Sequence, residues 1–359
     1  MSYDQIIARL KKAARAFFKN PDFVIERYVL IVGLIFGLVF IFLIPPMQGA
    51  DEPNHFMRAY QISEGHFTSD EVVGSRGGIN PNLVNYKTPN YGGTLPMAVV
   101  DYAQATYGMH GRTRNKLTHA EFEKLLHIKI DGRTRKAAFP NTGAYSPIAY
   151  LPSATALAVG HLFSNRVMTL SYLARLSDLV VGLALIVLAI RLLPFGKLPA
   201  AVLALLPMTI SQLTIISADT MAVAISFLAV ALTLHYSFRK KDMNRWDIVW
   251  LVGVYVILGL NKQSLVPLAL LNVGLLFNPL IRRKKAWLIA GGCLVGGLVA
   301  STAWNGLVKQ AVIDGYHQTY LTADYRGQVH WLIHHPLSYL RVLYQSFFTS
   351  DFTIVPMSF

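Results

Sequence analysis

Charged residues and cysteine are both scarce in this sequence. Of its 359 residues only 14% are charged, whereas 53% are hydrophobic. A soluble domain carries about 25% charged residues, so this composition excludes an ordinary soluble protein and indicates a polytopic membrane protein. The single cysteine, Cys293, lies in an apolar run and has no second cysteine to pair with, which excludes a disulfide framework within the chain.

Acidic residues are few as well. The 19 Asp and Glu residues stand against 33 Lys and Arg residues, which gives a formal net charge of +14. Many of the cations fall in short loops between apolar runs and form two clusters: Arg239, Lys240, Lys241 and Arg245, and Arg282, Arg283, Lys284 and Lys285. Such clusters are typical of orientation signals and of contacts with anionic lipids, each cation contributing about 1 kcal/mol. The sequence therefore predicts anionic membrane lipids, and not nucleic acid, as partners.

Seven apolar runs follow one another along the chain. The first, Tyr28 to Pro46, is nearly free of charge and long enough for the roughly 30 Å hydrocarbon layer, which takes about 20 helical residues. The others cover about Tyr172–Leu193, Leu198–Ile216, Met221–Tyr236, Trp246–Leu260, Leu265–Pro279 and Ala286–Trp304. This pattern predicts an all-α polytopic membrane protein with about seven transmembrane helices.

The basic residues predict how these helices are oriented. Five cations precede the first run: Arg9, Lys11, Lys12, Arg15 and Lys19. The positive-inside rule therefore places the N-terminus in the cytoplasm, with the chain in the plasma membrane. The apolar core exceeds that of a cleavable signal peptide, which favours an uncleaved anchor. From Ile6 to Phe18 apolar and basic residues occupy opposite faces, the pattern of an interfacial helix on the inner leaflet.

A further run, Ser146–Phe163, is short and contains Pro147 and Pro152. If it crossed the membrane, both four-cation clusters and Lys197 would lie outside; if it does not cross, all three lie inside. Because basic short loops stay cytoplasmic, we interpret this run as a juxtamembrane helix on the outer surface.

The predicted organisation has five parts. They are an interfacial helix (1–24), the first transmembrane helix (25–46), an outer loop with juxtamembrane helices (47–169), transmembrane helices two to seven (170–305) and an outer C-terminal segment (306–359). In the outer loop, we expect short helices and irregular chain from Thr68 to Ala138, including an amphipathic helix at Thr118–Ile130. In the last part, Pro336–Phe348 predicts a second surface helix or the start of an eighth span.

The acidic pair Asp51-Glu52 lies just past the first run and is followed by Pro53, a residue that suits the first helical turn. One interpretation is that an acidic residue only caps this helix. The other is that Asp51, His55 and Arg58, spaced at i, i+4 and i+7, share one face and bind a substrate. A catalytic carboxylate from Asp51 or Glu52 would act there as general base, and His55 would orient it or help to hold a divalent metal.

Three further residues are predicted at the same outer level. Asp219 follows the third span, Arg175 opens the second, and Lys262 lies in the short outer turn between the fifth and sixth. Asp219 either caps the fourth helix or faces the same cavity as Asp51. Arg175 and Lys262 either extend to lipid headgroups or hold a phosphate.

Two strings around the acidic pair carry a family resemblance: Pro45-Pro46-Met47-Gln48-Gly49-Ala50-Asp51-Glu52-Pro53-Asn54-His55 and, after it, Arg58-Ala59-Tyr60-Gln61. They are similar to the signature of the bacterial membrane-protein family called domain of unknown function 2142. Matching strings follow in order: Tyr145-Ser146-Pro147, Tyr150-Leu151-Pro152, Ala174-Arg175-Leu176, Leu206-Pro207-Met208 and Ser217-Ala218-Asp219. That family in turn resembles GT-C glycosyltransferases, such as protein O-mannosyltransferases and the aminoarabinose transferases of lipid A.

This resemblance implies a module of seven spans, an acidic residue and two juxtamembrane helices in the first outer loop, and a polyprenyl-phosphate sugar donor. Members of the family usually continue with further spans, whereas this sequence ends at Phe359, so the extra spans are either absent by nature or missing from a shortened form.

We therefore expect an inverting membrane glycosyltransferase that moves a sugar from a polyprenyl phosphate to an envelope glycan, lipid or protein. Asp51 or Glu52 would be catalytic; His55, Arg58, Arg175, Asp219 and Lys262 would bind substrate. A divalent cation, Mg or Mn, is a possible cofactor. The alternatives are a lipid or polysaccharide transporter or flippase and a non-catalytic membrane scaffold. A transporter tends to carry ionisable residues near the bilayer midplane, whereas the third, fourth, fifth and seventh runs have none in their interiors.

Overall fold

The computed structural model describes residues 5, 21–72, 90–106, 109, 115–312 and 325–348. The chain divides into two compact units, Met1–Gln318 and Thr319–Phe359, and each is described by itself. The interfacial helix predicted at Ile6–Phe18 lies outside the described residues.

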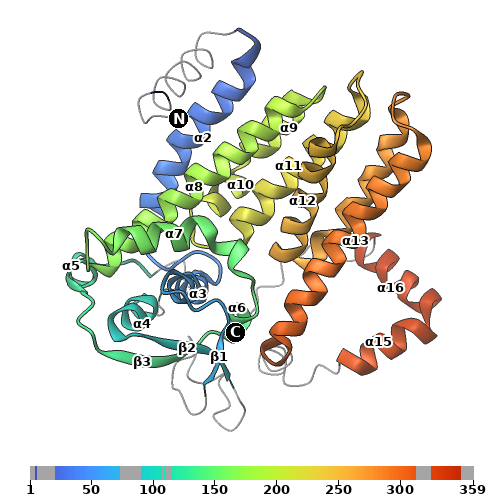
Figure 1. Ribbon diagram of the computed structural model, residues 1–359. Coiled ribbons are helices and arrows are strands. Elements are labelled where there is room, and N and C mark those ends of the chain that lie inside the picture. The colour runs from blue at the N-terminus through green and yellow to red at the C-terminus, as the bar shows by residue number, and fades with distance from the viewer. Residues whose placement is uncertain are drawn as a thin grey trace. The chain divides into compact units, whose positions relative to one another are not determined.

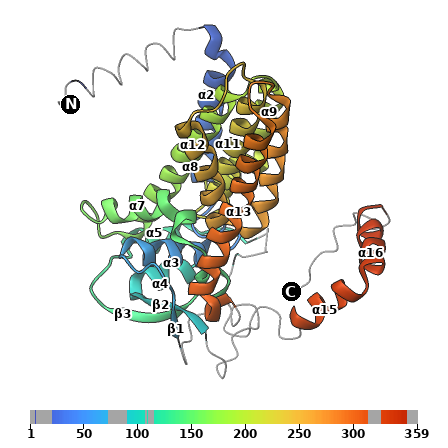
Figure 2. The same cartoon turned by 45° about the vertical axis from the view of Figure 1, so that its right-hand side comes forward.

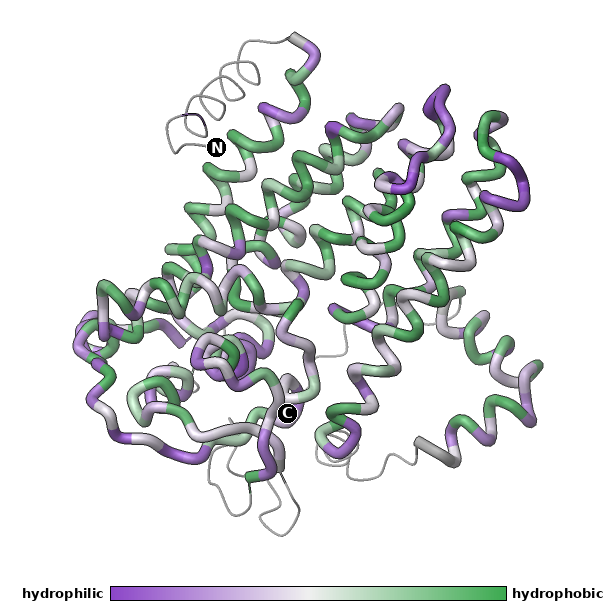
Figure 3. Tube along the Cα trace, in the orientation of Figure 1, coloured by the Kyte–Doolittle hydropathy of each residue, from purple (hydrophilic) through white to green (hydrophobic). Residues whose placement is uncertain are grey.

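Four helices in the first unit are long and apolar enough to cross a membrane. They are α2 (Val24–Leu43), α8 (Val167–Leu192), α11 (Ala218–Phe238) and α13 (Arg283–Leu307). All four coincide with predicted apolar runs, and they stand in one layer of helices (Figures 1 and 2). Figure 3 shows that this layer is mostly hydrophobic along its length and hydrophilic at its ends. The molecule is thus a mostly helical polytopic membrane protein, as the composition predicts.

The other three apolar runs form shorter or broken helices. The run at 198–216 is split into α9 (Lys197–Ala204) and α10 (Pro207–Leu213), because Pro207 disfavours a helical conformation at Leu206. The next forms α12 (Arg245–Asn261), begun by a capping box between Asn244 and Asp247. The last forms η4 (Gln263–Phe277), a 3₁₀-helix of 15 residues. A 3₁₀-helix rises about 2.0 Å per residue, so η4 reaches about 30 Å, as far as 20 residues of α-helix.

Contacts between helix termini define two ends of this layer. At the first, which we call the basic end, Lys197 Nζ donates to Glu26 Oε1 at 2.7 Å and Lys285 Nζ to Asp242 Oδ1 at 2.9 Å. His235 Nδ1 lies 3.1 Å from the Leu192 carbonyl oxygen, which places the C-terminal ends of α8 and α11 there as well. Lys197 and both basic clusters therefore share one end, the arrangement expected if the run Ser146–Phe163 does not cross the membrane.

A layer of short helices and one sheet covers the opposite end, which we call the site end (Figure 1). Its elements in chain order are α3 (Glu52–Ser63), β1 (Asp70–Val72), β2 (Asn90–Pro96), α4 (Met97–Gln104), α5 (His119–His127), β3 (Thr134–Ala138), α6 (Pro140–Gly143), η3 (Pro147–Tyr150) and α7 (Leu151–Gly160). The helix predicted near Thr118–Ile130 is confirmed as α5, which Thr118 and Glu121 begin with a capping box.

The sheet corrects the prediction of an all-α chain. β2 pairs antiparallel with β1 on one side and with β3 on the other. At Gly92 a Cβ atom would lie only 1.9 Å from the Ala137 carbonyl oxygen, so the close approach of β2 and β3 requires glycine. Such short, glycine-containing strands carry no clear alternation of apolar residues, which explains why the sequence pattern did not reveal them.

The run at Ser146–Phe163 forms η3 and α7, which pack against α3 and α8. No side chain within α7's own N-terminal turn caps it. Asp178, buried in α8, lies beside Ser153 in the first turn of α7. It makes no pair with Arg175, three residues before it, because all donors of Arg175 go to other acceptors.

The buried core of the site end joins this layer to α8. Phe56 and Tyr102 pack edge to face with ring centroids 6.0 Å apart, and Tyr150, Leu157 and Leu170 lie in the same cluster. The core fixes α3, η3 and α7 relative to the helix layer, so side chains from distant parts of the sequence meet at this end.

The second unit contains α15 (Tyr325–His334) and α16 (Pro336–Phe348). The helix predicted at Pro336–Phe348 is thus present. Its 13 residues are fewer than the roughly 20 that cross a bilayer.

Candidate functional site

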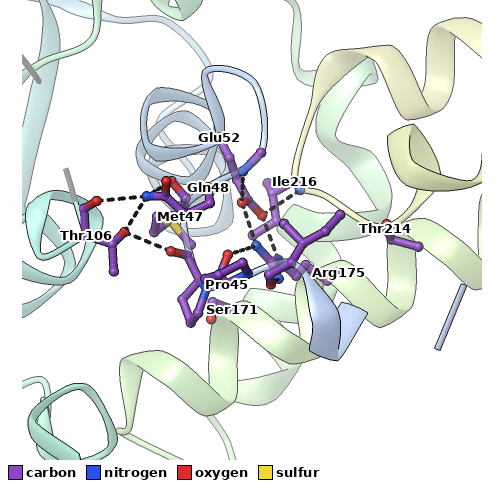
Figure 4. A network of polar contacts seen from close by, with 12 residues as sticks. Pro45, Met47, Gln48, Glu52, Thr106, Ser171, Arg175, Thr214 and Ile216 are labelled. Atoms are coloured by element: carbon purple, nitrogen blue, oxygen red, sulfur yellow. Dashed lines mark hydrogen bonds and ion pairs between the residues drawn. The ribbon is translucent and has the colours of Figure 1, made fainter. Parts of the chain in front are cut away.

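A fully buried ion pair holds the chain segment that leads into α3. Arg175 in α8 and Glu52 in the first turn of α3 form a two-point contact: Nε donates to Oε1 at 2.7 Å and Nη2 to Oε2 at 2.6 Å (Figure 4). The Glu52 carboxylate also accepts from the backbone N–H groups of Gly49, at 3.0 Å, and Ile216, at 3.2 Å. The pair therefore ties α3 to α8 and to the connection between α10 and α11.

Every N–H group of Arg175 has an acceptor. Besides its two bonds to Glu52, it donates to the carbonyl oxygens of Ile41, Ile44 and Pro45 at 2.9–3.1 Å. A guanidinium has five donors, and these five bonds use all of them. Arg175 thus ends α2 by taking up carbonyl groups that the helix cannot satisfy itself.

These contacts separate the predicted site residues into two groups. Both oxygens of Glu52 and all donors of Arg175 are occupied within the protein, and both residues are buried. Neither has an atom left for a ligand in this conformation, so the geometry supports a structural role for the pair. Asp51, next to Glu52, has different surroundings.

Asp51 is exposed and adopts a left-handed backbone conformation, with φ 52° and ψ 13°. It precedes α3 as the N-cap residue, but its side chain makes no capping bond, so the capping interpretation is wrong for Asp51. No described residue donates a hydrogen bond to its carboxylate. Met47, in the same turn, also has positive φ, 61°. Non-glycine residues in this region carry strain, and such residues cluster at functional sites.

His55 lies one turn into α3 and faces two tyrosines. Its Nδ1 is 2.6 Å from the hydroxyl of Tyr150, and its ring lies 5.9 Å from the ring of Tyr145, centroid to centroid. Burial lowers the pKa of His55 to about 4, although the charges of Asp51 and Asp219 act in the opposite direction. His55 is therefore neutral at pH 7.

Lys262 and Asp219 lie at the same end of the helix layer. Lys262 Nζ is 2.8 Å from Asp219 Oδ1, and both side chains are partly exposed. Burial lowers the pKa of Lys262, but its hydrogen bond to Asp219 and the charges of Tyr145 and Asp219 raise it by more. The net shift is upward, and Lys262 is cationic. This ion pair partly neutralises the charge of each residue. Both side chains remain accessible to a ligand because they are partly exposed.

The electrostatic neighbours of His55 and Tyr145 bring these groups together. Asp51, Asp219 and Lys262 all act on the pKa of His55 and on that of Tyr145. We call these five residues the polar cluster. It lies at the site end, where α3, η3, α11 and α12 meet. The prediction that Asp51 and Asp219 face a common region is consistent with this arrangement.

Arg58 does not face the polar cluster. It is fully buried and donates to the carbonyl oxygens of Phe67 at 2.6 Å and Tyr145 at 3.0 Å. Burial lowers the pKa of Arg58 to about 10. The geometry therefore supports a role in positioning Tyr145, whereas the sequence predicted that Arg58 binds substrate.

Sequence reasoning did not select Tyr145 and Tyr150 as functional residues. Both occur in strings quoted for the family resemblance, Tyr145-Ser146-Pro147 and Tyr150-Leu151-Pro152, but a tyrosine in a run of apolar residues has no distinctive spacing. The position of their rings around His55 depends on how η3 packs against α3.

A bound divalent cation stays a prediction. Within the described part of the chain, no group of three or more His, Cys, Asp or Glu side chains is arranged to hold a metal ion.

A layer of apolar helices capped at one end by a polar, partly exposed cluster defines a polytopic membrane protein. The chain belongs to the family of predicted membrane proteins called DUF2142, whose model matches residues 34–357. No curated protein and no solved structure matches the chain.

Proposed function

We propose that this protein is an integral membrane glycosyltransferase of GT-C type, which transfers a sugar from a polyprenyl phosphate to a cell-envelope acceptor. One observation carries the proposal: the exposed carboxylate of Asp51, a residue with a strained backbone, shares the polar cluster with a cation, an aromatic ring and a neutral histidine. The resemblance of the family strings to GT-C glycosyltransferases also supports it.

In this proposal Asp51 is the general base. Its carboxylate takes the proton of an acceptor hydroxyl as that oxygen attacks the anomeric carbon of the donor sugar. The bond from the anomeric carbon to the phosphate oxygen breaks, and the leaving polyprenyl phosphate keeps the electron pair. A glycosyl-transfer transition state has oxocarbenium character, which a nearby carboxylate also stabilises. Glu52 is the weaker candidate because four hydrogen bonds already occupy its carboxylate.

Lys262 is the proposed partner of the donor phosphate. A cation placed where negative charge develops lowers the barrier for a departing phosphate. Lys262 has three donors, and one of them goes to Asp219. Arg175 is the weaker candidate for this role, since all of its donors are used within the protein.

The proposal places the chain in the plasma membrane with seven spans, the basic end in the cytoplasm and the polar cluster outside. Lys197 and both basic clusters support this orientation by the positive-inside rule. Because η4 is about 30 Å long as a 3₁₀-helix, we count it as a span although it has only 15 residues.

Two measurements on protein in nanodiscs test the proposed function. Native mass spectrometry of gently extracted protein should show a co-purified polyprenyl phosphate. Sugar transfer from a labelled polyprenyl-phosphate hexose to envelope lipid or glycan fractions should depend on the protein. Absence of both the bound lipid and the transfer, across hexose donors and acceptor fractions, contradicts the proposal and favours the transporter or scaffold alternatives.

Replacing Lys262 by Met should weaken binding of the donor by roughly 10- to 150-fold, because a charge-assisted hydrogen bond contributes about 1.5–3 kcal/mol. Lys262→Arg should recover part of this affinity, since the charge returns with different geometry. Isothermal titration with a short-chain polyprenyl-phosphate hexose measures both variants. Asp219→Asn is the matched control: it frees Lys262 from its carboxylate, so donor affinity should be kept or raised. Unchanged affinity in folded Lys262→Met protein removes Lys262 from the phosphate site.

Labelling of single cysteines should report the topology. In a Cys293→Ala background, a cysteine at exposed Asn165, between α7 and α8, should react in intact cells with a membrane-impermeant thiol reagent. A cysteine at exposed Lys240, at the basic end, should react only after the cells are permeabilised. Labelling of the Lys240 position in intact cells contradicts the proposed orientation.

A further inference from the structure

The contact between His55 and Tyr150 determines more than their proximity. Tyr150 is fully buried, and among the described residues its hydroxyl has one hydrogen-bond partner, His55 Nδ1, at 2.6 Å. A phenol has one proton to donate, and a neutral imidazole carries its proton on either Nδ1 or Nε2. The direction of this single bond therefore decides which nitrogen of His55 is protonated.

The buried hydroxyl of Tyr150 needs an acceptor for its proton, and this need decides the direction of the hydrogen bond. If Nδ1 donated to the phenol oxygen, the Tyr150 proton would have no acceptor among the described residues. A buried donor without a partner costs about 1–3 kcal/mol. The favoured arrangement has Tyr150 donating to Nδ1, so the neutral imidazole of His55 carries its proton on Nε2.

The Nε2 atom remains available to a ligand. It makes no hydrogen bond to a described residue. It is not fully buried either, so it keeps contact with solvent. His161 is different, because its Nε2 is buried without a hydrogen bond. His55 as a whole is only 8% exposed, so a ligand can reach its ring only from the side of Nε2.

Burial keeps the imidazole of His55 neutral despite the carboxylates around it. Asp51, Asp219 and Glu52 raise its pKa, but burial, which acts in the same direction as the charge of Lys262, outweighs them. The imidazole is thus an uncharged donor in a region that also contains carboxylates, an ammonium group and the partly buried ring of Tyr145. Such a mixture of one aromatic face with a few oriented polar groups is typical of small-molecule sites.

We propose that Tyr150 fixes His55 as the neutral Nε2–H tautomer, which donates a hydrogen bond to an oxygen of a hydroxyl-rich ligand bound beside Tyr145. His55 is then a specificity-determining residue of the polar cluster, and Tyr150 is the residue that positions it. The identification of that ligand as a sugar phosphate rests on the proposed function, whereas the tautomer does not.

Nitrogen-15 NMR of histidine-labelled protein in nanodiscs tests the tautomer. The signal of His55 is identified by its loss in His55→Gln. At pH 7 it should show a protonated Nε2 and an unprotonated Nδ1. Tyr150→Phe removes the donor to Nδ1 and should produce a mixture of the two tautomers. A protonated Nδ1 or a charged imidazolium in the unsubstituted protein overturns the proposal.

Binding of a short-chain polyprenyl-phosphate hexose tests the donor role. His55→Leu should weaken binding roughly 2- to 12-fold, the loss of one neutral hydrogen bond. His55→Gln should restore most of this affinity because its amide places an N–H near the Nε2 position. Equal affinity of folded His55→Leu and unsubstituted protein overturns the donor role. If the unsubstituted protein does not bind this probe, the proposed ligand is wrong, while the NMR result still decides the tautomer.

Discussion

Replacing Asp51 by Asn is expected to lower the rate of sugar transfer by roughly 10²- to 10⁴-fold, the contribution of a positioned general base. Asn keeps the shape of the side chain and removes the charge. It is also one of the few residues besides glycine that adopt left-handed backbone conformation readily, so the strained φ of 52° at this position remains accessible. The variant should therefore fold normally and fail only in catalysis.

The left-handed conformation supplies a second, matched variant. Asp51→Gly removes the carboxylate while relieving backbone strain, so it should be at least as stable as the unsubstituted protein and equally inactive. Asp51→Ala keeps the strain without the local hydrogen-bonding ability of Asp, and should lower the thermal midpoint. Turnover of labelled donor and thermal unfolding in nanodiscs measure these effects. Full turnover in both Asp51→Asn and Asp51→Gly removes Asp51 as the base.

Replacing Arg175 by Met is expected to destabilise the protein by about 3–5 kcal/mol, because the Glu52 carboxylate then stays buried without its cation. The loss of donors to three carbonyl groups at the end of α2 acts in the same direction. Glu52→Gln should also destabilise, since it leaves the buried guanidinium without a charged partner. Denaturant titration of α-helical content in a mild detergent measures both changes.

The double variant Glu52→Leu with Arg175→Met distinguishes a structural pair from a ligand site. It removes both charges at once, and should be more stable than the sum of the single effects predicts, as expected for residues in direct contact. Arg175→Lys restores a charge but not the two-point geometry, and should be intermediate. If Arg175→Met is as stable as the unsubstituted protein and loses only donor affinity, Arg175 belongs to the phosphate site after all.

The sequence by itself determined the class of protein and the outline of its helices. Runs such as Tyr28–Pro46 and Tyr172–Leu193 are long and mostly apolar, and hydrocarbon is a favourable environment for them. The basic clusters sharing one end of the helix layer also followed from the sequence, because their alternation with apolar runs is a property of chain order alone. Local capping was equally accessible: Thr118 and Glu121 begin α5 within four residues of chain.

The predicted site was found only in part because its signals depend on contacts across the chain. The pair Asp51-Glu52 was selected as one unit, since two adjacent carboxylates look alike in a sequence. Arg175, 123 residues further along the chain, forms an ion pair with the carboxylate of Glu52. The turn before α3 leaves the carboxylate of Asp51 exposed. In the same way Arg58 was expected at the site, but packing directs its guanidinium to the carbonyl group of Tyr145.

Only the tertiary structure decided which polar side chains are buried and saturated and which remain accessible. A buried charge is tolerated only where partners satisfy it, and those partners are backbone groups and side chains brought together by packing of α3 against α8 and η3. The sequence determined where the chain enters the apolar layer, and the packing at one end of that layer decided which residues remain available to bind a ligand.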